Sequence, residues 1–136
     1  MTDRDAQFAD LAARAAEARK WSYSPYSGYA VGAAILAASG RIYDGANVEN
    51  AAYPITICAE RAAGVKAVSE GEREFTAIAV STANGGMPCG ACRQFLSEFG
   101  LDAVVLVADA EGKLLKQTTV RQLLPDSFGP AQLKQP

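Results

Sequence analysis

Hydrophobic and polar positions in the N-terminal third of the chain follow first a helical period and then a strand period. Four apolar residues recur at helical spacing: Phe8, Leu11, Ala15 and Ala18. They predict a helix over residues 4–20. The segment 24–29 contains a proline and a glycine and is typical of a loop. The mainly apolar segments 30–39 and 41–48, which meet at a Ser-Gly turn, predict two strands joined as a hairpin.

Helical and strand patterns alternate over the rest of the chain. The pattern predicts helices over 58–70, 89–99 and, as a short element before Pro125, 119–124. It predicts strands over 75–82, 103–109 and 112–117. Strands that alternate with helices after an opening hairpin indicate an α/β domain, in which helices cover both faces of a mixed sheet.

Composition and charge narrow the class of protein. The chain has 136 residues, enough to bury a core, and we expect residues 1–136 to form a single domain. Hydrophobic residues make up 49% and charged residues 21%, values typical of globular domains. The net charge is −2, and the longest basic run is the pair Arg19-Lys20. A nucleic-acid groove needs clustered positive charge, so we expect no nucleic-acid partner.

The N-terminal segment and the cysteine count indicate the cellular compartment in which the protein is expected. Residues 1–20 are acidic and amphipathic, unlike a secretory signal. The longest apolar stretch, 29–38, is too short to span a bilayer, so we expect no membrane partner. The chain has three cysteines, an odd number that does not favour a disulfide framework. We therefore expect the protein in the reducing cytoplasm.

The three cysteines have the spacing of a metal site. Cys89 and Cys92 form C-x-x-C, and Cys58 begins the other predicted helix. A structural zinc site is closed by four cysteine or histidine ligands, but the chain has no fourth cysteine and no histidine. Zinc held by three thiolates keeps a position open for water, as in catalytic sites. Both cysteine segments begin helices, whose N-termini stabilise thiolates.

A zinc site that binds water also needs an acid–base group and positive charge near the thiolates, and Glu60 and residues near the cysteines can supply them. Two residues after Cys58, the Glu60 carboxylate can take a proton from water and return it to a substrate nitrogen. Three thiolates on a dication leave a charge of −1, which weakens the acidifying power of the metal. Arg61 can offset this charge by donating to a ligand sulfur, and Arg93 and Gln94, beside Cys92, can also reach the ligands and support them.

Each of these residues, taken alone, also has an interpretation that involves no metal. The C-x-x-C pair could be a redox pair, and any one cysteine could be a buried packing residue. Glu60 alone would be a solvated helix residue. The joint spacing of three cysteines and one glutamate favours catalytic zinc.

Two segments resemble a known family. CAE at 58–60 and PCGACRQ at 88–94 are similar to the signature of the zinc-dependent nucleoside deaminases, in its three-cysteine form. Three further stretches, 24–36, 45–54 and 123–130, resemble the small homotetrameric cytidine deaminases. The resemblance covers about Ser24 to Gly129, and it implies a three-layer α/β/α sandwich around a mixed five-stranded sheet.

The resemblance also implies roles for residues that the pattern alone treats as turn, surface or packing residues. Asn47 and Glu49 match residues that hold the ribose hydroxyls. Tyr29 stands where the family usually has a phenylalanine against the pyrimidine, so its hydroxyl is a departure. Ala59 matches a backbone contact to the base. Tyr53 and Phe128 match aromatic residues that are lent across subunit interfaces.

Taken together, the resemblance implies one Zn²⁺ per chain, held by Cys58, Cys89 and Cys92, and a homotetramer with its sites at subunit contacts. It implies hydrolysis of cytidine, and of deoxycytidine, to the uridine nucleoside and ammonia in pyrimidine salvage, with Glu60 as the proton carrier. Three alternatives remain: a deaminase of an aminonucleoside antibiotic such as blasticidin S, a polynucleotide deaminase, and a non-catalytic zinc-stabilised nucleoside-binding domain.

Overall fold

Helices and strands lie close to the segments that the hydrophobic pattern predicts. The computed structural model describes residues 2–133. Its strands are β1 (Gly32–Ala37), β2 (Ile42–Ala46), β3 (Phe75–Ser81), β4 (Val104–Ala108) and β5 (Leu114–Thr119). Its α-helices are α1 (Asp3–Ala18), α2 (Ala59–Ser69), α3 (Gly90–Phe99), α4 (Val120–Leu123) and α5 (Pro130–Leu133). Two 3₁₀ helices, η1 (Arg19–Trp21) and η2 (Tyr53–Ile55), complete the elements of the described residues. Each predicted strand and helix is present, with slightly shifted ends.

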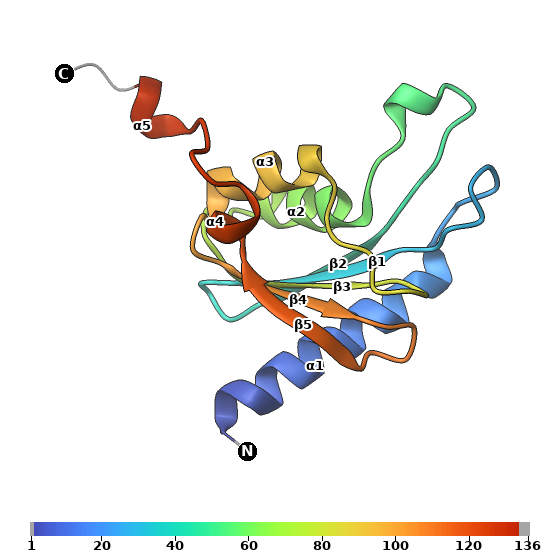
Figure 1. Cartoon of the computed structure of the whole chain (residues 1–136), viewed down its shortest axis with the longest axis horizontal. Helices are drawn as coiled ribbons and strands as arrows, with labels where there is room; N and C mark the ends of the chain where they lie inside the picture. The colour runs from blue at the N-terminus through green and yellow to red at the C-terminus, as the bar shows by residue number, and fades with distance from the viewer. Residues whose placement is uncertain (1, 134–136) are drawn as a thin grey trace.

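The sheet has five strands in the order β2-β1-β3-β4-β5. Strands β3 and β4 are parallel, and every other neighbouring pair is antiparallel, so the sheet is mixed. Helix α1 crosses one face of the sheet, and α2, α3 and α4 lie over the other (Figure 1). This arrangement confirms the expected three-layer α/β/α sandwich with a mixed five-stranded sheet.

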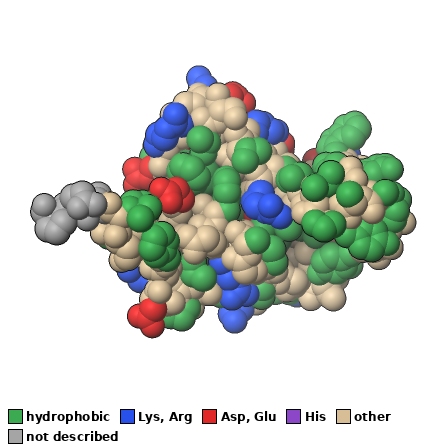
Figure 2. Space-filling model, turned by 90° about the horizontal axis from the view of Figure 1, so that it is seen from above, with side chains coloured by type: hydrophobic (Ala, Val, Ile, Leu, Met, Phe, Trp, Pro, Cys, Tyr) green, Lys and Arg blue, Asp and Glu red, His purple; other side chains and the backbone are tan. Residues whose placement is uncertain are grey.

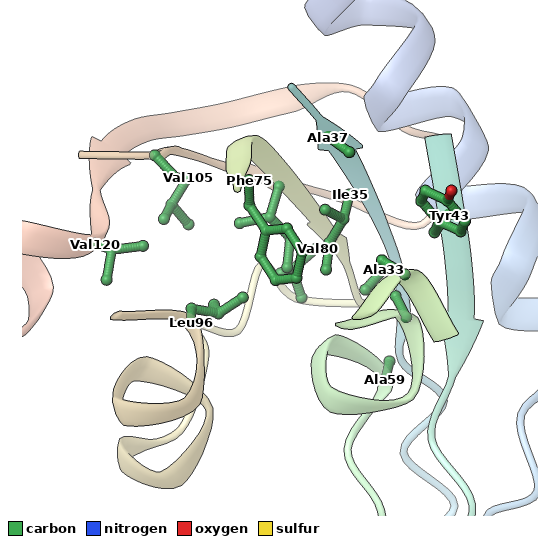
Figure 3. Packing of buried hydrophobic residues seen from close by; sticks show 14 of the residues in the cluster. Ala33, Ile35, Ala37, Tyr43, Ala59, Phe75, Val80, Leu96, Val105 and Val120 are labelled. Atoms are coloured by element: carbon green, nitrogen blue, oxygen red, sulfur yellow. The ribbon is translucent and has the colours of Figure 1, made fainter. Parts of the chain in front are cut away.

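The core lies in two layers, one on each face of the sheet. Between the sheet and α2 and α3, Ile35, Val80 and Val105 pack with Ala59 and Leu96 (Figure 3). On the other face, α1 side chains pack against the alternate residues of the same strands. Because both faces are covered, β1, β3 and β4 are apolar at nearly every position instead of alternating, as strands buried on both sides are.

Two single-turn helices, η2 and α5, escape the sequence pattern. Helix η2 contains Pro54, and α5 begins at Pro130. A proline fits the first turn of a helix because its missing N–H needs no partner there. Elements of three or four residues are too short to show a hydrophobic period, and the pattern therefore assigns both segments to loops.

Close packing of α2 on β2 fixes the helix that begins after Cys58. A Cβ atom added at Gly45 of β2 would lie 2.6 Å from the backbone nitrogen of Ala63 and 3.0 Å from the carbonyl oxygen of Ala59. Both are backbone atoms, which cannot rotate away. The absence of a side chain at Gly45 therefore lets the first turn of α2 sit directly on the sheet.

Replacing Gly45 with alanine is expected to lower the free energy of unfolding by about 1–3 kcal/mol, because overpacking forces the helix off the strand. Chemical denaturation measures the change. Gly90→Ala is the matched control, since no atom lies within 4 Å of its added Cβ and its position in α3 favours alanine. Equal stability of Gly45→Ala and the wild type would contradict the packing argument.

Candidate active site

The three thiols, far apart in sequence, meet at the N-termini of two helices. Cys58 is the N-cap residue of α2, Cys89 is the N-cap residue of α3, and Cys92 lies in the first turn of α3. Their sulfur atoms all lie within 4.8 Å of one another, and the Cys58 and Cys89 sulfurs are 3.9 Å apart. Two sulfurs at about 2.3 Å from one tetrahedral ion lie about 3.8 Å apart. The cluster therefore has the size and the donor chemistry to hold a zinc ion.

The electrostatics of the cluster already favour a thiolate. The pKa of Cys58 is lowered to about 5, first by the hydrogen bond from the Cys92 thiol and then by the Arg61 guanidinium. The pKa of Cys92 is raised by its hydrogen bond with Cys58 and by burial. In the metal-free chain the negative charge therefore lies on Cys58, and a bound dication would draw the remaining protons off.

Arg61 lies where the sequence predicts it. Its Nη2 atom donates to the Cys58 sulfur over 3.3 Å, and its pKa is raised, first by that hydrogen bond. Its Nε atom is buried and has no hydrogen-bond partner among the described residues. The guanidinium is thus held against the thiols and reduces the negative charge that three thiolates would place on a metal.

Gln94 is placed differently from the prediction that it supports the thiols. It is exposed, and its Nε2 atom donates to the carbonyl oxygen of Phe128 over 2.9 Å. Residues two apart on a helix do not share a face, so Gln94 points away from the side that presents Cys92. Arg93 takes a different role, because its guanidinium binds the carbonyl oxygens of Pro88 and Leu123 and fastens the start of α3 to α4.

Glu60 is buried beside the thiols in the first turn of α2, with only 4% of its surface exposed. Its pKa is raised to about 7, chiefly because burial penalises the charged carboxylate and then because of the nearby Cys58 charge. A carboxyl group with a pKa near neutrality can both accept and donate a proton. This carboxyl group shares one cavity with Cys58 and Cys89.

The cavity has a volume of about 260 Å³ and a wall of mixed chemistry. Cys58, Glu60 and Cys89 line it together with Asn47 and Glu49. The apolar residues of the wall include Val31, Ala59, Val80 and Met87. A mostly apolar pocket with a few convergent polar groups is the usual form of a small-molecule site.

Glu49 is held by the loop before β1. Its carboxylate accepts hydrogen bonds from the backbone N–H groups of Tyr26 (2.9 Å) and Ser27 (3.1 Å), and from the Ser27 hydroxyl. These bonds lower the pKa of Glu49, the Ser27 hydroxyl having the largest effect. Glu49 is therefore an ionised acceptor in the cavity wall. The sequence pattern gives no sign of Ser27, whose contact joins segments far apart in the chain.

Asn47 is buried, and the fold already uses most of its hydrogen-bonding capacity. Its Oδ1 atom accepts from the Val31 N–H and from the Ser22 hydroxyl, and its Nδ2 atom donates to the Tyr29 carbonyl oxygen. An amide has two N–H donors, so one remains available to a ligand. Toward a ligand hydroxyl Asn47 can therefore act as a donor.

The remaining predicted residues differ in whether they line the cavity that contains Glu60. Tyr29 and Ala59 line the cavity with Glu60. Tyr53, 68% exposed, lines an adjoining cavity with Tyr26, and Phe128, 57% exposed, lines neither cavity. The fold of one chain thus brings most of the predicted site together and leaves Phe128 apart from it.

Comparison with known proteins bears directly on this site. The family model for the cytidine and deoxycytidylate deaminase zinc-binding region matches residues 5–108, which include all three cysteines and Glu60. The cytidine deaminase of Sporosarcina psychrophila is 47% identical over 90% of this chain and 92% of its own. That of Mycobacterium tuberculosis is 40% identical over 88% and 87%.

Comparison with solved structures points to the same family. The crystal structure of the cytidine deaminase from Burkholderia pseudomallei has a TM-score of 0.83 at 40% identity and covers 94% of this chain and 100% of its own. That from Mycobacterium tuberculosis has a TM-score of 0.76 at 38% identity and covers 95% and 99%. The resemblance found in the sequence is confirmed, and the chain belongs to the family of zinc-binding cytidine and deoxycytidylate deaminases.

Proposed function

We propose that this chain catalyses the hydrolytic deamination of cytidine and deoxycytidine to uridine and deoxyuridine, with release of ammonia, in pyrimidine salvage. The observation that carries the proposal is the buried Glu60, with a pKa near neutrality, in one cavity with the clustered thiols. The cytidine deaminases that are 40–47% identical over most of the chain support the same substrate.

The proposed mechanism assigns one proton carrier. Zinc, held by Cys58, Cys89 and Cys92, would supply a Lewis acid that lowers the pKa of water. Glu60 accepts a proton from the attacking water and delivers it to ring nitrogen N3 while the oxygen bonds to carbon C4. Glu60 then helps a second proton reach the exocyclic nitrogen, the C4–N bond breaks and ammonia leaves. Cytidine and water are thereby converted to uridine and ammonia.

The wall chemistry favours a nucleoside over a nucleotide. Glu49 is ionised, and Asn47 keeps one N–H to donate, so together they can accept from and donate to ribose hydroxyls. Among the described residues, no lysine or arginine lines this cavity or the adjoining one. A 5′-phosphate would meet the Glu49 carboxylate with no cation to offset its charge. We therefore expect the sugar of the substrate to carry no 5′-phosphate.

Assembly into a homotetramer is part of the proposal. Exposed apolar side chains gather at the end of the molecule opposite the C-terminal helix (Figure 2). They belong to η1, to η2 and to the loops beside them: Trp21, Tyr23, Tyr26, Val48, Tyr53, Ile55 and Ile57. Exposed patches of this kind are typical of protein interfaces. Phe128 lines neither of the two cavities described above, and we propose that it and Tyr53 complete the site of a neighbouring subunit.

We further propose that residues 1–136 work as one catalytic domain in the cytoplasm. Within residues 2–133, no helix is both long and apolar enough to cross a membrane. The three cysteines must stay reduced to hold a metal, and a reducing compartment keeps them so.

Absorbance loss on incubation with the metal-analysed protein tests the function. Cytidine and deoxycytidine should be consumed rapidly by protein that holds about one zinc per chain, and deoxycytidine monophosphate, blasticidin S and a single-stranded oligonucleotide should not. Saturable nucleoside binding without turnover would instead indicate a binding domain. Turnover of blasticidin S or the oligonucleotide alone would replace the proposed substrate.

A further inference from the structure

The hydroxyl of Tyr29, a residue of the cavity wall, contacts the loop that supplies Thr82, Gly86 and Met87 to the same wall. Tyr29 belongs to the loop that leads into β1, and its hydroxyl donates a 2.6 Å hydrogen bond to the Oδ1 atom of Asn84. Asn84 lies in the loop 82–88 between β3 and α3, separated from Tyr29 by 55 positions in the sequence. Gly32 of β1 pairs with Ser81 of β3, so the bond joins the two segments that leave the same end of this strand pair, beyond its last backbone pairing.

The loop 82–88 leads directly to Cys89 and is fastened at both of its ends. At its start, the Thr82 N–H donates to the carbonyl oxygen of Ala108 in β4 over 3.3 Å, and within the loop the Gly86 N–H donates to the Thr82 hydroxyl over 2.7 Å. At its end, Arg93 donates to the Pro88 carbonyl oxygen over 2.8 Å. The contact between Tyr29 and Asn84 adds a third point, which ties the middle of the loop to the segment before β1.

Gly86 packs against the same hydroxyl. A Cβ atom added at Gly86 would lie 2.4 Å from the Tyr29 hydroxyl oxygen, whereas the next atoms would be 3.6 Å away or more, at ordinary contact distance. The backbone of Gly86 is not in the left-handed region, so an alanine there would be opposed by this contact alone. The Gly86 backbone and the hydrogen bond to Asn84 together restrict where the Tyr29 hydroxyl can lie.

We propose that Tyr29, Asn84 and Gly86 form a clasp that fixes the plane of the Tyr29 ring and the position of the loop 82–88, so that the pyrimidine enters a preformed slot. This inference rests on the proposed function for the identity of the ligand. Because the hydroxyl is used by the clasp, it does not contact substrate, and Tyr29 presents only its ring to the base. Tyr29 and Asn84 are then positioning residues.

The clasp predicts an effect on binding and not on chemistry, since none of its members contacts Glu60 or a thiol through a hydrogen bond. Tyr29→Phe removes the donor, Asn84→Ala removes the acceptor, and Gly86→Ala pushes the hydroxyl out of place. Each should raise KM for cytidine about three- to tenfold, the factor to which the net free energy of one hydrogen bond corresponds. Each should leave kcat within about twofold of the wild type.

Combined variants test the clasp as a unit. Tyr29→Phe/Gly86→Ala should have the KM of Tyr29→Phe alone, because the second change removes nothing further. Tyr29→Phe/Asn84→Ala should have nearly that KM, because Asn84→Ala then removes only the long hydrogen bond, 3.5 Å, that the Thr82 hydroxyl donates to Asn84. Asn84→Asp keeps an acceptor oxygen and should keep a KM close to the wild-type value. Additive increases in KM, or an equal defect in kcat, would overturn the proposal.

Tyr43→Phe is the matched control. It also removes a hydroxyl that donates to a side chain, here Glu72 over 2.7 Å, but it lies on β2 away from the cavity. Its KM should stay at the wild-type value. A KM increase in this variant as large as that of Tyr29→Phe would show a general loss of stability, and the clasp would be rejected.

Hydrogen exchange of the protein without substrate separates the clasp from the proposed function. The Gly86 and Met87 amides should exchange faster in Tyr29→Phe than in the wild type, while those of β3 stay unchanged. Faster exchange in a protein that does not deaminate cytidine would support the clasp and reject the proposed function. Unchanged exchange and KM in an active enzyme would reject the clasp alone.

Discussion

Turnover of cytidine is expected to fall by about 10²- to 10⁴-fold when Glu60 is replaced with glutamine, the range that one general acid–base group contributes. Glutamine has nearly the same shape and fills the same buried space, but it cannot accept and release the proton. KM should change less than kcat, because the loss falls on the transition state. Steady-state kinetics with cytidine, together with zinc analysis, measure both quantities.

The Glu60→Gln variant should remain folded. Burial raises the folded-state pKa of Glu60 to about 7, above its ordinary value of 4.5, so the ionised carboxylate destabilises the metal-free chain as the pH rises through this interval. Glutamine removes that cost, and metal-free Glu60→Gln should unfold at no lower a denaturant concentration than the wild type at pH 8. Glu70→Gln, the same change at the exposed end of α2, is the matched control and should keep full turnover. Near-wild-type activity of Glu60→Gln would contradict the proposed mechanism.

Local patterns predicted the parts of the site that lie on helix starts. Cys58 and Glu60 share one turn, and Cys89 and Cys92 share another, so their relative positions follow from helical geometry once each helix is recognised. The sheet between them was also predictable in outline, because the apolar runs of β1, β3 and β4 identify strands covered on both faces.

Contacts between distant segments were not predictable in this way. The Ser27 hydroxyl on Glu49 and the Tyr29 hydroxyl on Asn84 join loops that no periodic pattern relates. Gln94 shows the converse error, because closeness in sequence to Cys92 suggested a shared face that the turn of the helix does not allow. Loop side chains can be placed only when the fold that brings the loops together is known.

Removal of one thiol is expected to abolish zinc retention. Cys92 is the buried member of the cluster, and Cys92→Ala leaves two thiols for an ion that otherwise has three. Loss of residues that merely support metal ligands costs about 10- to 100-fold in affinity or activity, so loss of a ligand should reduce turnover by more than about 100-fold. Metal analysis after gel filtration and cytidine turnover measure the two effects.

The stability of this variant separates lost metal from a damaged fold. A ligand that binds only the folded chain stabilises it by about 2.7 kcal/mol at 100 times its dissociation constant, so zinc should raise the melting temperature of the wild type. Val105→Ala truncates a fully buried side chain of β4. It should melt at a lower temperature than the wild type yet keep the increment that zinc adds. Cys92→Ala should lose that increment, since its defect lies in the site. If Cys92→Ala bound one zinc per chain and gained the wild-type increment, the three thiols would not form the metal site, and the role of Glu60 beside them would lose its basis.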